Sequence, residues 1–372
     1  MQHPGYFNST QENVQVVVEQ NTVVDFDMAL LKFGWLIESV DQEGDVGNRS
    51  DIALDSTGRP HISYYAANGD LKYAYYDGST WETELVDSTG NDVVSYYVTS
   101  LAIDSSDRPH ISYSGYEDMR YAWHDGSDWR KEVVETCYFG CSPSLALDSD
   151  DHPHIAFNPM LVLKYIWHDG STWNEGPLSG SSLLAFPIEP GWAVGAPCLA
   201  LDSADRPHLS YYTEKSVDSK LMYAWLDGTT WQTLTVETKD LVGYDNSLAL
   251  DSTNRPHISY NDASGTNFLS DLKYATYDGS AWDIRDVDSN EYEDVGGCSS
   301  LALDSAGHPQ IIYYDGDNRA LKYARYNGTI WGIQTVDGEE YDVGCGSLVL
   351  DSAGQPHLSY YDRSNGDLKY AR

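Results

Sequence analysis

The stretch Ile52–Tyr65 reads IALDSTGRPHISYY, and closely related stretches follow it six more times along the chain. Measured at the aspartate of the LDS triplet, successive copies are 49, 44, 54, 49, 53 and 47 residues apart. These aspartates are Asp55, Asp104, Asp148, Asp202, Asp251, Asp304 and Asp351. Self-similarity at a nearly fixed period is the signature of a repeat architecture, so this stretch decides the fold.

Each repeat contains four short segments of alternating or aromatic-rich character. In the first repeat they read SDIALDS, PHISYYA, DLKYAYYD and WETELVDS, and clusters of Gly, Pro, Asp and Ser separate them. Such clusters mark turns, and none of the segments has a helical period. Four strands at a period of about 50 residues predict one blade of a β-propeller, with strands a to d in chain order.

The two ends of the chain complement each other. The seventh repeat stops at Asp367–Arg372, DLKYAR, and lacks a fourth strand. A segment of the missing type, WLIESVD, occurs at Trp35–Asp41, before the first repeat. We therefore predict an all-β, seven-bladed propeller of four-stranded antiparallel blades, whose ring is closed when Trp35–Asp41 completes the last blade. Closure removes sheet edges that would otherwise be open to aggregation.

The predicted propeller spans residues 32–372, and residues 1–31 form an N-terminal extension. Within that extension, ENVQVVVEQNTVVDFDM at Glu12–Met28 resembles the last hairpin of carboxypeptidase-regulatory-like β-sandwich domains. This resemblance implies that the extension is the remnant of a preceding β-sandwich. We find no secretory signal in the first residues, because Met1–Pro4 carries no basic segment and no apolar run follows.

The charge excludes some classes of partner. The chain has 22 basic and 58 acidic residues and a formal net charge of −36, and 29 of its 372 residues are tyrosines. Such a surface repels nucleic acid and anionic lipid, so we expect neither as a partner. There is no apolar run of about 18 residues, so we expect no membrane insertion. A monomeric ring, within a longer multidomain chain, is the expected form.

The repeated histidines have two interpretations, a set of active sites or a structural element. Both faces of a blade are covered by neighbouring blades, so a strand-b histidine must find a buried partner. The candidates in the first repeat are Ser63, Asp77 and Trp81, a network that resembles the one in WD-repeat propellers. The sixth repeat has Gln310 instead, which hydrogen-bonds but does not titrate, and this favours a structural role. The histidines are His61, His110, His154, His208, His257 and His357.

The turn DGSTW at Asp77–Trp81 resembles the Asp box of other propellers, although it lacks the preceding serine. In those families the box is a folding element remote from the active site. The resemblance therefore implies structure and does not imply sialidase chemistry.

Function is expected where the repeats differ. The a–b and c–d turns, which form one face of the disc (the turn face), are monotonous, whereas the b–c and d–a loops of the opposite face (the loop face) vary. Binding residues concentrate on variable loops held by a rigid scaffold. Aromatic rings beside carboxylates suit sugars and also protein anchors. The candidate ligand-binding residues are Arg49, Tyr96, Tyr97, Tyr138, Phe139, Trp192, Tyr244, Asp245, Tyr292 and Tyr341.

A metal and a disulfide are further candidates on this face. Asp45, Asp294 and Asp342 belong to a recurring (E/D)DVG motif and offer the oxygen ligands that Ca²⁺ prefers, so calcium is the one cofactor considered. Cys298 and Cys345 occupy equivalent places in adjacent repeats, which makes them a candidate disulfide. Cys137 and Cys141, which flank YFG, are candidates for closing a small loop.

Taken as a whole, the repeat resembles bacterial and archaeal secreted propellers built from LALDSxGxPHISYY and LKYAxxDGxxW units. This resemblance implies an extracellular or cell-surface location. The favoured hypothesis is a non-catalytic, lectin-like binding or adhesion module that recognises glycan or protein through the loop face. A polysaccharide lyase is the enzymatic alternative, because some lyase families use seven-bladed propellers. A structural spacer of a surface protein is the third hypothesis.

Overall fold

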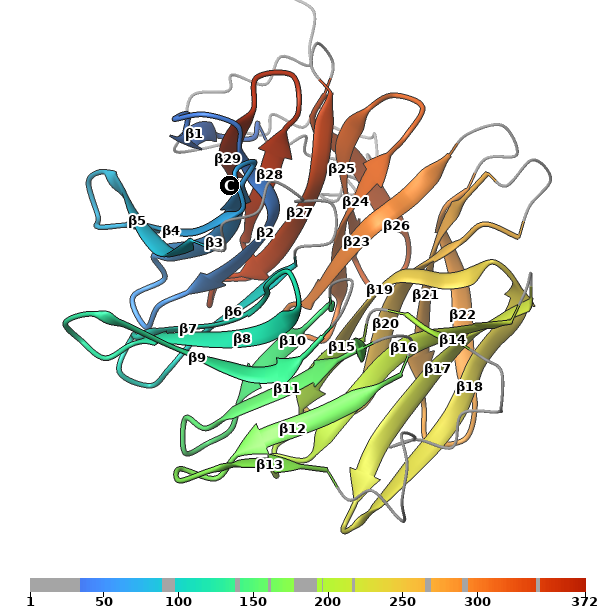
Figure 1. Ribbon diagram of the computed structural model, residues 1–372. Helices are drawn as coiled ribbons and strands as arrows, with labels where there is room; N and C mark the ends of the chain where they lie inside the picture. Colours follow the sequence, from blue (N-terminus) through green and yellow to red (C-terminus); the bar gives the residue numbers. More distant parts are fainter. Residues whose placement is uncertain are drawn as a thin grey trace, which may run out of the picture. The chain divides into compact units, whose positions relative to one another are not determined.

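Residues Gly34–Arg372 fold into seven antiparallel β-sheets, the blades of the propeller (Figure 1). The computed structural model describes residues 34–88, 98–137, 141–159, 162–176, 193–195, 197–215, 218–264, 269–289, 294–338 and 342–372. The predicted extension, residues 1–31, lies outside these ranges. No helix in the described ranges is long and apolar enough to span a bilayer.

Every blade is a four-stranded antiparallel sheet in which neighbours in sequence are neighbours in space. Blades 1 to 3 contain β2 (Val46–Leu54), β3 (Pro60–Ala66), β4 (Asp70–Tyr76) and β5 (Trp81–Ser88); β6 (Thr99–Ile103), β7 (Pro109–Ser114), β8 (Asp118–His124) and β9 (Trp129–Thr136); β10 (Ser144–Leu147), β11 (Pro153–Phe157), β12 (Lys164–His168) and β13 (Trp173–Glu175). Blades 4 and 5 contain β15 (Cys198–Leu201), β16 (Pro207–Lys215), β17 (Asp218–Asp227) and β18 (Thr230–Asp240), with β14 (Ala193–Val194) added beside β16; β19 (Val242–Leu250), β20 (Pro256–Asp262), β21 (Asp271–Tyr277) and β22 (Trp282–Asp288). Blades 6 and 7 contain β23 (Val295–Leu303), β24 (Pro309–Asp315), β25 (Ala320–Tyr326) and β26 (Trp331–Asp337); β27 (Val343–Leu350), β28 (Pro356–Asp362), β29 (Asp367–Ala371) and β1 (Ile37–Asp41).

The ring closes as the sequence predicts. The last sheet has the order β1-β29-β28-β27, so the first strand of the described chain is the outer strand of the last blade. Two backbone hydrogen bonds between Leu36 and Arg372 extend this pairing. On the inside of the disc, each first strand lies against the first strand of the next blade, and β27 lies against β2 (Figure 1). The prediction of a seven-bladed propeller closed by its N-terminal strand is confirmed.

The hydrophobic core is divided among the seven junctions between blades. Each of seven buried clusters combines residues of two neighbouring blades. At the junction of blades 7 and 1, for example, Ile62 and Tyr64 of β3 pack with Leu368 and Tyr370 of β29. Burial of such side chains stabilises by about 1.5–3 kcal/mol each, so the blades are held to one another by their core rather than by their loops.

The strand-b histidines have different partners from those that the sequence predicts. The Nδ1 atom of His61 is hydrogen-bonded to the hydroxyl of Tyr73 in β4, and its Nε2 atom lies 3.6 Å from Asp55. The hydroxyl of Ser63 instead accepts from Thr99, and Asp77 accepts the N–H groups of its own turn. Choosing Ser63, Asp77 and Trp81 as partners was wrong, because the twist of the sheet brings the strand-c tyrosine over the imidazole.

The fourth-strand tryptophans connect neighbouring blades. Trp129 of blade 2 lies edge-on to Tyr73 of blade 1, with ring centroids 5.2 Å apart. Trp81 contacts Tyr370 of blade 7 in the same way and donates its indole N–H to Glu38. The repeated contacts form a chain from aspartate through histidine and tyrosine to the next blade's tryptophan. The pairs are Trp35–Tyr323, Trp81–Tyr370, Trp129–Tyr73, Trp173–Tyr121, Trp231–Tyr165, Trp282–Tyr223 and Trp331–Tyr274.

Candidate functional site

The described histidines all lie away from the loop face. Six are in the second strands of their blades, His152 and His308 are in a–b turns, and His124 and His168 end the third strands at the c–d turns. Burial lowers the pKa of the six strand-b imidazoles, although nearby aspartates oppose the shift. The loop face therefore has no histidine within the described ranges, and acid–base chemistry there would depend on other groups.

Only three of the predicted binding residues can be placed. Tyr96, Tyr97, Tyr138, Phe139, Trp192, Tyr292 and Tyr341 lie outside the described residues. Arg49, Tyr244 and Asp245 lie at the loop-face starts of the inner strands β2 and β19. Arg49 and Asp245 are exposed at equivalent positions and have φ angles of 54° and 47°, a left-handed conformation that non-glycine residues rarely adopt.

Tyr244 belongs to a compact group of side chains at the junction of blades 4 and 5. Its ring lies against that of Tyr212, the last tyrosine of PHLSYY in β16, with centroids 4.3 Å apart and planes tilted by 37°. The hydroxyl of Tyr244 donates to Glu214, which lies on the same strand as Tyr212. Gly195 packs against the ring of Tyr212, because a Cβ atom added to Gly195 would stand 1.7 Å from that ring. We call Tyr212, Glu214, Tyr244 and Asp245 the tyrosine platform.

The electrostatics of the platform keep both phenols protonated. Burial, followed by the charges of Glu214 and Asp245, raises the pKa of Tyr212 to about 12. Burial and the hydrogen bond to Glu214 raise the pKa of Tyr244 still further. Both rings are half-buried. The platform thus combines two half-buried phenol rings with two carboxylates, and its phenols are poor general bases.

A disulfide at the loop-face ends of the inner strands contacts the platform. Cys298 of β23 is bonded to Cys345 of β27, with Cα atoms 5.3 Å apart, which joins blades 6 and 7. The backbone N–H of Cys298 donates to the carboxylate of Asp245 at 2.9 Å, and the hydroxyl of Ser299 donates to the carbonyl oxygen of the same residue at 2.8 Å. The candidate pair from the sequence is therefore bonded in the structure, and it lies next to a predicted binding residue.

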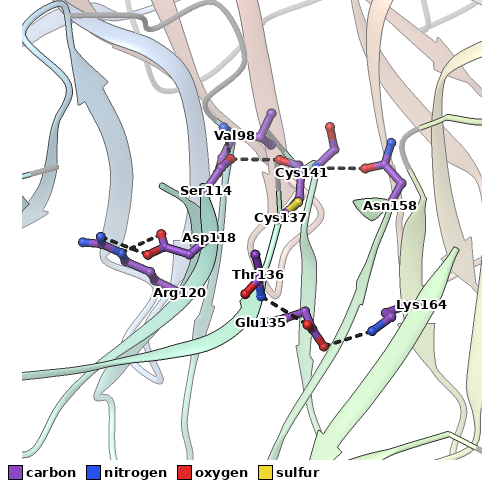
Figure 2. The surroundings of a disulfide bond; sticks show 11 residues. Val98, Ser114, Asp118, Arg120, Glu135, Thr136, Cys137, Cys141, Asn158 and Lys164 are labelled. Carbon is purple, nitrogen blue, oxygen red and sulfur yellow. Dashed lines mark hydrogen bonds and ion pairs between the residues drawn. A yellow bond between two sulfur atoms is a disulfide. The ribbon is translucent and has the colours of Figure 1, made fainter. Parts of the chain in front are cut away.

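In blades 1 to 3, the strand-b residue equivalent to Tyr212 makes internal contacts. The buried hydroxyl of Tyr65 in blade 1 donates to the carbonyl oxygen of Ser114, and the hydroxyl of Ser114 donates to that of Cys141. Asn158 accepts the N–H of Ser142 in blade 3. Cys141 is bonded to Cys137, so this loop is held by a disulfide and by side chains from both sides (Figure 2). In the described part of blades 1 to 3, the side chains at this strand-b position are therefore engaged in internal contacts.

The carboxylates predicted to bind calcium have other partners. Asp45 accepts from the hydroxyl of Tyr361 at 2.5 Å, and Asp342 accepts from that of Tyr314 at 3.3 Å. The carboxylate of Asp294 accepts the N–H of Ser270. They lie one each in blades 1, 7 and 6. In the described part of the chain, no group of three or more His, Cys, Asp or Glu side chains is placed to hold a metal ion. A calcium site remains a prediction.

A belt of polar side chains connects the inner strands of successive blades. In six of the seven belt positions the side chain accepts the N–H of the next blade's strand, as Ser100 does for Leu145 at 3.1 Å, whereas Ser347 donates to Asp51. Asp51 accepts from Leu101 N–H and from the hydroxyl of Ser347, which closes the belt between blades 7 and 2. Burial raises the pKa of this carboxylate. The belt residues are Asp51, Ser100, Ser144, Cys198, Ser247, Ser300 and Ser347.

Comparisons with known proteins bear on the fold. No protein-family model and no curated protein matches the chain. It is similar to the structure of an ulvan lyase of polysaccharide lyase family PL25 bound to -[GlcA(1-4)Rha3S]-, with a TM-score of 0.59 and 12% identity over 91% of this chain and 94% of that one. It is also similar to a variant of the Aleuria aurantia lectin in complex with Fucalpha1-6GlcNAc (TM-score 0.52, 12% identity, 79% and 96% covered).

A third similar structure is the SapL1 lectin in complex with alpha methyl fucoside (TM-score 0.51, 15% identity, 78% and 97% covered). At such identities the likeness shows a shared propeller fold and nothing narrower. The resemblance to secreted propellers of this repeat type therefore remains a prediction.

Sequence reasoning missed two members of the platform. Tyr212 and Glu214 belong to a strand that the repeat identifies as scaffold, so they were not among the candidates. The sequence did contain a signal, because the residue that follows the repeated PHISY-type segment of strand b varies from blade to blade. It is Tyr65, Ser114, Asn158, Tyr212, Asn261, Tyr314 and Tyr361 in the seven blades.

Proposed function

We propose that this chain is a non-catalytic, extracellular glycan-binding module whose binding surface is the loop face. The observation that carries the proposal is the tyrosine platform, in which the rings of Tyr212 and Tyr244 lie beside the carboxylates of Glu214 and Asp245. Partly apolar sugar faces stack on aromatic rings, and sugar hydroxyls donate to carboxylates. A binding site needs such convergent polar groups on a rigid base, and the inner strands provide it.

Three further features support a lectin-like function over a catalytic one. The face has no histidine within the described ranges, and its platform phenols have raised pKa values. The strand-b histidines, which do titrate, are buried on the turn-face side and repeat in six blades. Two of the similar structures are lectins in complex with fucose-containing ligands. An extracellular location would agree with the two disulfides, because such bonds persist in oxidising compartments.

The polysaccharide lyase alternative has one observation in its favour. Arg363 lies beside Tyr314 on the loop face, with its guanidinium 5.1 Å from the ring centroid. A cation next to a phenol is a minimal arrangement for proton abstraction beside a uronate carboxylate. Burial and the charge of Asp342, however, raise the pKa of Tyr314, so its phenolate is disfavoured. Release of unsaturated products that absorb in the ultraviolet would establish this alternative.

A glycan array at moderate salt, with and without EDTA, tests the proposal first. Saturable binding without turnover is expected. With the best ligand, Tyr212→Ala and Tyr244→Ala are each expected to weaken binding by roughly 10-fold or more, since stacking and its hydrogen bonds contribute about 1–3 kcal/mol. Dependence on EDTA would identify a calcium requirement. A ligand that proves to be a protein, or no ligand at all, would favour the adhesion or spacer hypotheses.

Tyr116→Ala is the matched control. Tyr116 is an exposed tyrosine in the b–c loop of blade 2, on the same face but away from the platform. Its removal is expected to leave the affinity unchanged. Equal losses in this variant and in Tyr212→Ala would show that binding does not depend on the platform.

A further inference from the structure

A second cluster of side chains lies on the loop face at the junction of blades 6 and 7. It contains Tyr314 at the end of β24, Arg319 in the turn before β25, Asp342 before β27 and Arg363 in the loop after β28. The guanidinium of Arg363 lies over the ring of Tyr314 and 3.6 Å from the carboxylate of Asp342. The backbone carbonyl of Arg319 accepts the N–H of Val343, which places it beside the same segment.

The arginines of this cluster differ from most of those elsewhere in the protein. In four a–b turns the arginine is held by an aspartate at 2.6 Å; these residues are Arg59, Arg108, Arg206 and Arg255. Arg363 is exposed; its guanidinium lies 3.6 Å from Asp342 and donates to the hydroxyl of Tyr314 at 3.4 Å. The exposed guanidinium of Arg319 pairs with no other side chain in the described ranges. The two exposed guanidinium groups are therefore held less tightly than the arginines of the a–b turns.

The backbone around these groups has two unusual positions. Arg319 has a φ of 53°, a left-handed conformation that costs a residue with a Cβ atom about 1 kcal/mol or more. Gly344 lies beneath Arg363 and Tyr361, because a Cβ atom there would stand 3.3 Å from the Nε atom of Arg363. The carboxylate of the nearby Asp317 accepts the N–H of Asp294.

We propose that this cluster is an anion subsite of the binding face, which takes a sugar bearing a carboxylate or a sulfate ester. The inference rests on the proposed function and narrows it to acidic oligosaccharides. A planar guanidinium donates two parallel hydrogen bonds to either group, and within the described ranges neither arginine is held by a bidentate carboxylate. The ring of Tyr314 fixes the plane of Arg363, which lowers the entropy lost when the anion binds. Asp342 holds the guanidinium of Arg363 in place.

Matched variants and ligands test the subsite. The ligands are an oligogalacturonate, a sulfated galacto-oligosaccharide and a neutral galacto-oligosaccharide of equal length, titrated calorimetrically at one ionic strength. Arg363→Gln and Arg319→Asn are expected to weaken binding of at least one acidic ligand about 10-fold and to leave the neutral ligand unchanged. The two acidic ligands decide between carboxylate and sulfate. Arg325→Gln is the control, since Arg325 is an exposed arginine of β25 at the turn-face end of blade 6.

The outcomes separate this inference from the proposed function. If the wild type binds neutral and acidic ligands equally, or if Arg363→Gln weakens both alike, the subsite is refuted while the platform stands. If no oligosaccharide binds, the proposed function fails, and the subsite is then tested alone by titrating free glucuronate and inorganic sulfate against the arginine Nε–H signals in NMR. Shifts confined to Arg319 and Arg363 support it. Unchanged signals, or equal shifts at Arg325, refute it.

Discussion

Replacing one strand-b histidine by alanine is expected to destabilise the propeller without altering the binding face. His110 is buried, its Nδ1 atom is hydrogen-bonded to the hydroxyl of Tyr121, and its Nε2 atom lies 3.3 Å from Asp104. Tyr121 in turn lies edge-on to Trp173 of blade 3 at 5.4 Å. His110→Ala therefore leaves a buried phenol unpaired and removes packing at an interface between blades.

The expected cost follows from these two losses. An unsatisfied buried hydroxyl costs about 1–3 kcal/mol, and the cavity left by the imidazole adds about 1 kcal/mol. A total of about 2–4 kcal/mol corresponds, for a unit of this size, to a fall in Tm of about 3–6 °C. Calorimetry and urea unfolding measure the change, and glycan titration measures the affinity, which should not change.

The chain itself supplies the control for this prediction. Gln310 occupies the equivalent position in blade 6, where it accepts from Tyr323 and donates to the carbonyl oxygen of Gly354 at 3.2 Å. His110→Gln should therefore recover most of the stability lost in His110→Ala. Loss of glycan binding at an unchanged Tm would refute the structural role of the histidine, as would equal destabilisation by both substitutions.

Three other predictions concern stability. Burial lowers the folded-state pKa of the six strand-b histidines below the ordinary 6.5. Their contribution to the stability of the fold is therefore complete above that pH and is lost as the pH falls through the lowered pKa values. Tm measured from pH 7.5 to 4.5 should fall, and it should fall less steeply in histidine-to-glutamine variants. Asp41→Ala should lower the free energy of unfolding in urea by about 1–3 kcal/mol, because the Asp41 carboxylate on the closing strand binds Tyr64 and Lys72 of blade 1. An unchanged urea midpoint would show that ring closure does not depend on Asp41. Cys298→Ser should lower stability by about 2–4 kcal/mol through loss of a cross-link between residues that are 47 apart in sequence. It should also weaken binding at the platform, because the disulfide fixes the backbone whose N–H donates to Asp245. Unchanged affinity with reduced stability would separate the two effects.

The repeat predicted the fold well because the information that it carries is local. Turn residues, alternation within each strand and the position of the closing segment all lie within one repeat or at the chain ends. The histidine partners were harder to predict, although Asp55 and Tyr73 lie within 12 residues of His61. Which of several nearby polar side chains reaches the ring depends on the twist of the sheet, and the sequence does not specify that twist residue by residue.

The candidate site depended on contacts between different repeats. The sequence identified Tyr244 and Asp245 through their variable loop, but it did not show that Tyr212 of the preceding blade stacks on Tyr244. It also placed Asp45 and Asp342 in a hypothetical calcium site, whereas the structure gives both carboxylates tyrosine partners from the neighbouring blade. Residues separated by a whole repeat meet only when the ring has closed.

The amino-acid sequence alone determined the number of blades, the strand order and the way in which the last blade is completed, because periodic turns and apolar alternation act within each unit. The tertiary structure decided which side chains meet between units, including the tyrosine platform, the Cys298–Cys345 bond and the contact of Arg363 with Tyr314. The physical reason is that seven nearly identical sheets pack by the same core contacts, while the few residues that differ acquire partners only from the rotation of one blade against the next.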